Sequence, residues 1–60
     1  MAMTKDEVVA DILRRLDVAF DARMAKADAS SNLGAYGLSK IHTHTADGIR
    51  RAMEIVREYQ

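Results

Sequence analysis

The spacing of its apolar residues restricts the fold of this chain more than any other feature. Between Val9 and Ala27, and again between Leu38 and Tyr59, apolar side chains recur every three or four residues. Residues at this spacing lie on one face of an α-helix, so each segment reads as an amphipathic helix. A glycine-bearing stretch separates the two segments. The sequence therefore predicts an all-α fold, an antiparallel two-helix hairpin.

The first helix is predicted over residues 4–32. Thr4 and Glu7 have the spacing of a capping box, in which the threonine hydroxyl accepts a hydrogen bond from a free backbone amide. Asp6 and Glu7 place negative charge where the helix dipole is positive. Seven apolar residues share the face that we expect to be buried: Val9, Ile12, Leu13, Leu16, Phe20, Met24 and Ala27.

The second helix is predicted over residues 39–60, after a turn at 33–38. Gly34 is the expected stop of the first helix, because glycine tolerates the left-handed conformation common just past a helix. Ser39 is the expected N-cap of the second helix, with Thr43 or Thr45 as later alternatives. The apolar face of this helix comprises Leu38, Ile41, Thr45, Ile49, Ala52, Val56 and Tyr59.

Small residues lie in the middle of the second helix. Thr45, Gly48 and Ala52 would permit close approach of another helix, at the cost of the low helix propensity of glycine. The alternative interpretation is a hinge or partial break near residues 43–48.

The size of the chain predicts self-association. Sixty residues make one domain, 1–60, in which a single core is marginal, and no cysteine is present to restrain the unfolded chain. We therefore expect a homodimer that forms a four-helix bundle. The residues expected to carry self-association are Val9, Leu13, Leu16, Phe20, Ala27, Leu38, Ile41, Thr45, Ile49, Ala52, Val56 and Tyr59. This layout resembles that of the Rop class of plasmid copy-number proteins, and the likeness covers architecture and no motif.

Charge is balanced, with nine Lys and Arg residues against nine Asp and Glu residues. No global field favours nucleic acid or an anionic membrane surface. The first residues lack the cationic start and apolar run of a signal peptide, and no segment approaches the apolar length of a membrane span. We expect a cytoplasmic protein with no membrane partner.

Four side chains are candidates for contact with a partner. Arg23 falls within the apolar seam, where it either extends to solvent along its aliphatic stem or meets a carboxylate or phosphate. Tyr36 lies in the predicted turn, where packing over the end of the bundle is the alternative to a ligand contact. Arg50 and Arg57 lie seven residues apart on one outer face, although ion pairs along the helix explain the same residues.

His42 and His44 are the only histidines. Residues two apart on a helix diverge by about 200°, so this pair cannot chelate one metal ion from a single helix. A site shared across a dimer is the alternative to histidines at an interface rim. We expect no metal and no cofactor.

No motif for catalysis is present: cysteine is absent, and neither a phosphate-cradling glycine run nor a GxSxG sequence occurs. The leading hypothesis is a non-enzymatic protein-binding module, an adaptor or inhibitor of the kind that phages and plasmids encode, acting as a homodimer. One alternative is a nucleic-acid-binding regulator that uses Arg50, Arg51 and Arg57. The other is a monomeric ligand whose apolar stripe enters the groove of a larger protein partner.

Overall fold

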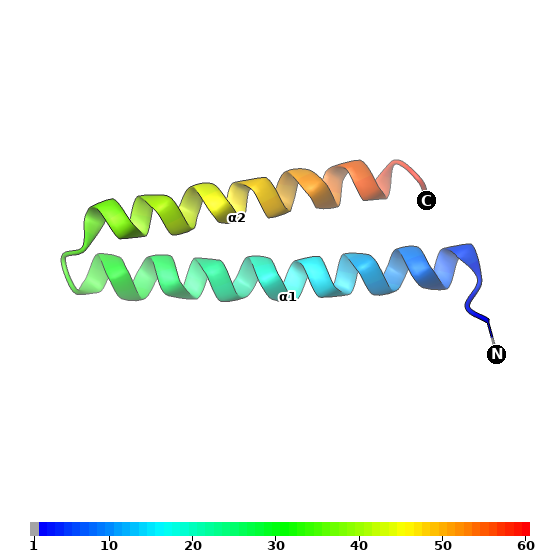
Figure 1. Cartoon of the computed structure of the whole chain (residues 1–60), viewed down its shortest axis with the longest axis horizontal. Helices are drawn as coiled ribbons and strands as arrows, with labels where there is room; N and C mark the ends of the chain where they lie inside the picture. Colours follow the sequence, from blue (N-terminus) through cyan, green and yellow to red (C-terminus); the bar gives the residue numbers. More distant parts are fainter. Residues whose placement is uncertain (1) are drawn as a thin grey trace.

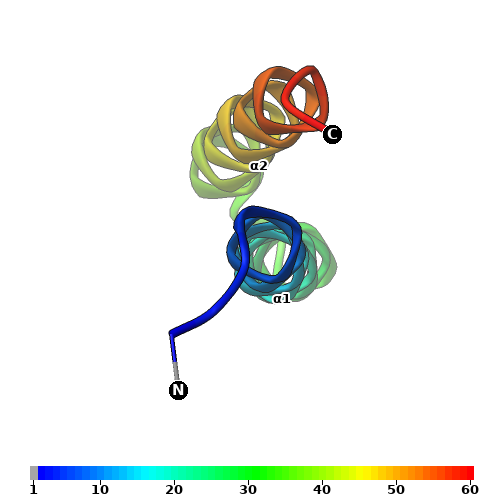
Figure 2. The same cartoon turned by 90° about the vertical axis from the view of Figure 1, so that its right-hand side faces the viewer.

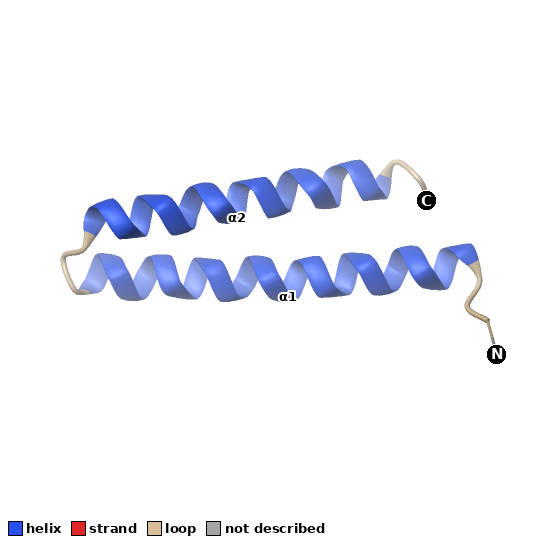
Figure 3. Cartoon of the chain, in the orientation of Figure 1, coloured by secondary structure: helices blue, strands red, loops and turns tan. Residues whose placement is uncertain are grey.

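The computed structural model describes residues 2–60, and within this range the chain is all-helical with no strand. Two helices, α1 (Lys5–Asn32) and α2 (Tyr36–Arg57), run antiparallel and side by side, so that both ends of the chain lie at the same end of the molecule (Figure 1). A short turn joins them (Figure 3). The molecule measures 48 × 21 × 10 Å. It is a helical hairpin one layer thick.

The start of α1 is the capped terminus that the sequence predicts. Thr4 is the N-cap, and its hydroxyl oxygen accepts a hydrogen bond from the backbone N–H of Glu7 at 3.2 Å. The same hydroxyl donates to the Glu7 carboxylate at 3.1 Å. Asp6 and Glu7 lie in the first turn, where negative charge stabilises the helix dipole. The predicted cap is confirmed.

The end of α1 is a Schellman motif built around Gly34. Gly34 has φ +78°, and its N–H donates to the carbonyl of Ser31 at 3.0 Å. The N–H of Ala35 donates to the carbonyl of Ser30 at 2.8 Å. These two bonds satisfy carbonyls that the helix leaves free at its end. The expectation that Gly34 stops the first helix is confirmed.

The start of α2 differs from the prediction. The helix begins at Tyr36 with Ala35 as N-cap, and no side chain caps it. Ser39 lies inside α2, where its hydroxyl donates to the carbonyl of Ala27 at 2.9 Å. This serine therefore bonds to α1 across the hairpin, because the turn is tighter than the sequence pattern indicates. At its other end the helix stops at Arg57, short of the predicted residue 60.

The middle of α2 is one continuous helix, with no break over residues 43–48. The hydroxyl of Thr43 donates to the carbonyl of Ser39, and that of Thr45 donates to the carbonyl of Ile41, each at 3.0 Å. Both threonines thus bond back four residues along their own helix. The structure contradicts the hinge interpretation.

The core between the helices is small. Its buried apolar residues are Val9, Ala27, Ala46 and Met53, and no large side chain in the described range is fully buried. Ala46 is 0% exposed, which marks it as the centre of the contact on α2. Ala46 and Met53 lie outside the predicted apolar face, so the face of α2 that packs on α1 is rotated from the expected one.

A single layer leaves much of the chain exposed. The accessible surface is 4623 Å², against about 3900 Å² for a compact folded protein of this mass. The radius of gyration is 14.3 Å, whereas a compact domain of this length has about 10.4 Å. Figure 2, viewed along the hairpin, shows the two helices with no third element beside them. The hairpin therefore buries less surface than a domain of its size usually does.

We predict that Gly34→Ala lowers the free energy of unfolding by about 1 kcal/mol, because a Cβ disfavours the left-handed conformation. Thermal unfolding followed by circular dichroism measures the loss. Gly37→Ala is the matched control: Gly37 lies inside α2, and an added Cβ meets no heavy atom within 4 Å. This control should gain up to about 1 kcal/mol. Equal stability of the two variants would contradict the assignment of the turn.

Candidate interaction surface

The most distinctive surface of the molecule is an apolar face along α2. Four large apolar side chains on one side of the helix are between 49% and 63% exposed: Leu38, Ile41, Ile55 and Tyr59. Isolated exposed apolar residues are ordinary, whereas a contiguous set marks an interaction site. We call six residues of α2, together with Tyr59 in the turn just after the helix, the α2 outer stripe; the six are Leu38, Ile41, Thr45, Gly48, Ala52 and Ile55.

The α2 outer stripe is separate from the face that packs on α1. That inner face comprises Ser39, His42, Ala46, Ile49, Met53 and Val56, which are buried or half-buried. The residues of this inner face are spaced by alternating steps of three and four residues, and from Ile41 onward the outer stripe has the same spacing. At 100° per residue, the two faces differ by about 110° around the helix. A helix with two such seams can pack against two different neighbours.

Helix α1 adds to the same side of the hairpin. Val8 and Ile12 are 42% and 41% exposed, and Ala19 lies on the same strip of α1. This strip is offset from the inner face of α1 by about 80°, in the same rotational sense as the outer stripe of α2. Because the helices are antiparallel, offsets in the same sense place both strips on one side of the hairpin. The two strips together form the apolar face of the hairpin, and the same spacing places the charged Lys26 on the α1 strip.

The residues predicted to carry self-association divide between the two surfaces. The expected residues of α1 are all buried or half-buried: Val9, Leu13, Leu16, Phe20 and Ala27. On α2, Ile49, Ala52 and Val56 are half-buried. Leu38, Ile41, Thr45 and Tyr59 are exposed. Sequence reasoning missed Ile55, and the seven-residue repeat that relates it to Ile41 through Gly48 was the signal for it.

The opposite side of the hairpin carries a shallow depression of about 210 Å³. It is lined by Asp17, Phe20, Arg50, Met53 and Arg57. The two predicted arginines are therefore neighbours at one rim, beside apolar surface from both helices. Arg50 also pairs with Asp47 at 3.6 Å, and both side chains are more than half exposed. The depression combines positive charge, one carboxylate and apolar side chains.

Arg23 and Tyr36, the other two predicted contact residues, lie elsewhere. The Nη1 of Arg23 lies 3.1 Å from the Nδ1 of His42 on α2. Because a guanidinium only donates, the Nδ1 of His42 is the acceptor in this contact. Arg23 is thus engaged within the chain. Tyr36 is 70% exposed at the first position of α2 and does not line the depression.

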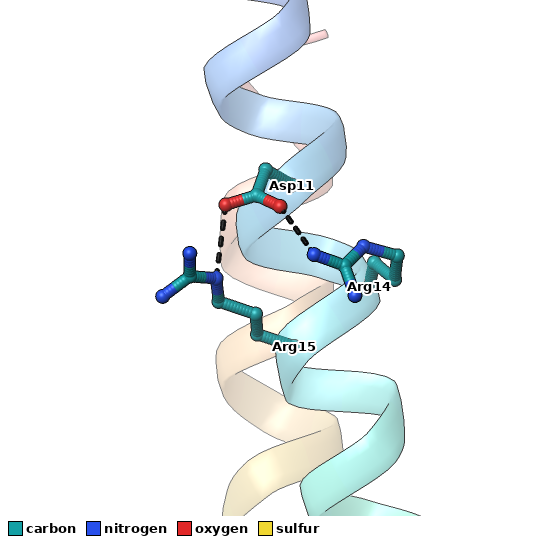
Figure 4. A network of polar contacts seen from close by, with 3 residues as sticks. All are labelled: Asp11, Arg14 and Arg15. Carbon is teal, nitrogen blue, oxygen red and sulfur yellow. Dashed lines mark hydrogen bonds and ion pairs between the residues drawn. The ribbon is translucent and has the colours of Figure 1, made fainter.

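Two further arginines are held by one carboxylate on α1. Figure 4 shows Asp11 accepting from Arg14 Nη2 at 2.6 Å and from Arg15 Nε at 2.9 Å. The hydrogen bond from Arg14, together with the charge of Arg15, holds the pKa of Asp11 below its usual 3.8 against a smaller opposing effect of desolvation. These charges stabilise one another on the surface of α1.

Neither histidine belongs to a metal site in the structure. His42 is half-buried against α1, while His44 is exposed. Over residues 2–60, no group of three or more His, Cys, Asp or Glu side chains is arranged to hold a metal ion. Neither helix, as far as the chain is described, is long and apolar enough to cross a membrane.

Comparison with known proteins gives no relative: no family model, no curated protein and no solved structure matches the chain. The two surfaces described above are therefore the features of the molecule that bear on its function.

We predict that Asp11 contributes an acid-dependent part of the stability. Its pKa is lower in the folded chain than its usual value, so its contribution is present at neutral pH and is lost as the pH falls below about 4. Thermal midpoints measured between about pH 3 and pH 6 at one protein concentration should fall more steeply for the wild type than for Asp11→Asn. Asp21→Asn, which removes a charge from the same helix and leaves both ion pairs intact, should follow the wild type.

Proposed function

We propose that this chain is a non-enzymatic protein-binding module that works as a homodimer. Two hairpins would pack through their broad apolar faces into a four-helix bundle, and the opposite sides would remain free to bind another protein. In this role the molecule would act as an adaptor or an inhibitor. The observation that carries the proposal is the exposure of the α2 outer stripe in a hairpin that already buries little apolar surface.

Dimensions support self-association as the use of this face. A stable interface of standard size buries about 800 Å² on each partner. The hairpin has a face of 48 by 21 Å, which is large enough to supply that area. Exposed apolar side chains on a monomer of this size would otherwise stay in contact with water, at a cost of about 25 cal/mol per Å². A second copy is always available at the concentration of the chain itself.

The depression on the opposite side supports a second, different contact. Arg50 and Arg57 offer bidentate hydrogen bonds to carboxylates, while Phe20 and Met53 offer apolar contact beside them. An acidic side chain followed by an apolar one on a partner protein suits this combination. Arginine flanked by apolar side chains is common where proteins bind one another.

The nucleic-acid alternative is less well supported. Asp17 lies in the same depression as the two arginines, and Asp47 already pairs with Arg50. These carboxylates would repel phosphate, and the formal net charge of the chain is zero. The depression therefore suits a protein surface of mixed character better than a polyanion.

Sedimentation equilibrium tests the dimer. We expect the wild type to sediment as a dimer at micromolar concentration, and Ile41→Lys to raise the dimer dissociation constant at least about tenfold, the equivalent of about 1.4 kcal/mol. Helicity should persist, because the Ile41 side chain is 60% exposed in the hairpin. Val18→Lys is the matched control, since Val18 is 61% exposed on the side of α1 turned away from α2. A helical wild-type monomer at all concentrations would refute the proposal.

Capture from a lysate of the source cells tests the depression. We expect a protein retained by the immobilised wild type to be lost when Arg50→Glu and Arg57→Glu are combined, because the charge offered to its carboxylates is reversed. The control combines Lys5→Glu and Arg14→Glu, which changes the net charge equally at sites outside the depression. Retention of the same proteins by all three baits would exclude the depression as the contact.

A further inference from the structure

The α2 outer stripe has a symmetric pattern of side-chain size about Gly48. Ile41 and Ile55 lie seven residues to either side of it, and smaller residues, Thr45 and Ala52, lie between each isoleucine and the glycine. Leu38 and Tyr59 extend the pattern with a large side chain at each end. All the large members are about half exposed or more in the hairpin. Read in either direction, the stripe runs from large to small to large.

Such a pattern fits a second copy of itself in one orientation. When two α2 helices pack antiparallel about a two-fold axis at Gly48, Ile41 of each copy meets Ile55 of the other, and the small residues meet at the centre. An interface made twice by the same surface is the usual way in which two identical chains associate. We propose that the dimer forms through antiparallel contact of the two α2 outer stripes, with Gly48 at the axis. The inference rests on the self-association proposed above.

Gly48 has no explanation within a single hairpin. A Cβ added there meets no heavy atom within 4 Å, so packing on α1 does not require glycine. Glycine inside a helix is nevertheless unfavourable relative to alanine. Close approach of a second helix gives it a function, because helix axes about 8 Å apart leave room only for the smallest side chains at the crossing point.

The charges beside the stripe also favour the antiparallel orientation. Lys40 lies eight residues before Gly48 and Glu58 ten residues after it, while Asp47 lies one residue before it and Arg51 three after it. About an axis at Gly48, each of these residues is therefore two positions, about 3 Å along the helix, from the level of the oppositely charged residue of the other copy. In an antiparallel pair, each of these residues comes near the oppositely charged residue of the other copy. In a parallel pair, each would face its own counterpart and repel it. The pattern of side-chain size and the pattern of charge therefore both favour the antiparallel arrangement of the two α2 helices.

Cysteine cross-linking tests the arrangement, because the natural chain has no cysteine. Gly48→Cys should form a disulfide-linked dimer on its own, since the two Cα atoms at an axis fall within the 7 Å that a disulfide spans. Ile41→Cys alone and Ile55→Cys alone should stay largely uncross-linked, because each residue lies about 21 Å from its own counterpart. An equimolar mixture of these two variants should form the linked heterodimer. Val18→Cys is the control for random collision.

Each outcome of the cross-linking has a distinct meaning. If Ile41→Cys and Ile55→Cys each link with themselves, the helices are parallel and the inference is wrong while the dimer stands. If sedimentation gives a dimer and neither Gly48→Cys nor the mixture links above the Val18→Cys level, another face makes the interface. If the wild type is a monomer by sedimentation, the proposed function itself fails.

A second measurement needs no oxidation. Gly48→Leu places a bulky side chain at the proposed crossing point, and its Cβ meets no heavy atom of its own chain within 4 Å, so helicity should be kept while the dimer dissociation constant rises at least about tenfold. Ala25→Leu adds the same bulk at an exposed position of α1 outside the apolar face and should leave the dissociation constant unchanged. An unchanged dissociation constant for Gly48→Leu would overturn the inference.

Discussion

Everything in this molecule depends on one contact, the packing of α1 against α2. Ala27 and Ala46 are the two most buried residues of that contact, and the Ser39 hydroxyl donates a hydrogen bond across it to the carbonyl of Ala27. Two helices can cover each other on one side only. The contact that forms the hairpin therefore leaves the remaining apolar side chains of both helices without a neighbour. This unburied apolar surface goes with the elongated shape of the molecule, and it is the basis of the self-association that we propose.

The two sides of the hairpin differ in chemistry. One side is broad and apolar, with the α2 outer stripe as its main part, whereas the other holds Arg50 and Arg57 beside Phe20 and Met53. A molecule with this division can bury one side in a copy of itself and still present the other to a different protein. Self-association would then do more than stabilise the fold, because it would place two copies of the depression on one particle.

Some of the charged side chains form ion pairs within their own helix. Asp11 pairs with Arg14 and Arg15 on α1, and Asp47 pairs with Arg50 on α2. Exposed pairs of this kind contribute little to stability, typically less than about 1 kcal/mol each. Their larger effect is to mix the signs of charge along each helix. Specific contacts with a protein surface suit such a pattern better than long-range attraction to a polyanion does.

The sequence by itself determined the helical hairpin, its capped start at Thr4 and its turn at Gly34, because each depends on neighbours within a few residues. Only the tertiary structure decided which face of α2 meets α1. Two apolar seams run along this helix about 110° apart, and periodicity alone merged them into one stripe. In the structure the seam with Ala46 and Met53 packs on α1, and Ser39 bonds to α1 in place of capping α2. Leu38, Ile41 and Tyr59 are exposed because they lie on a side of the helix that does not face α1.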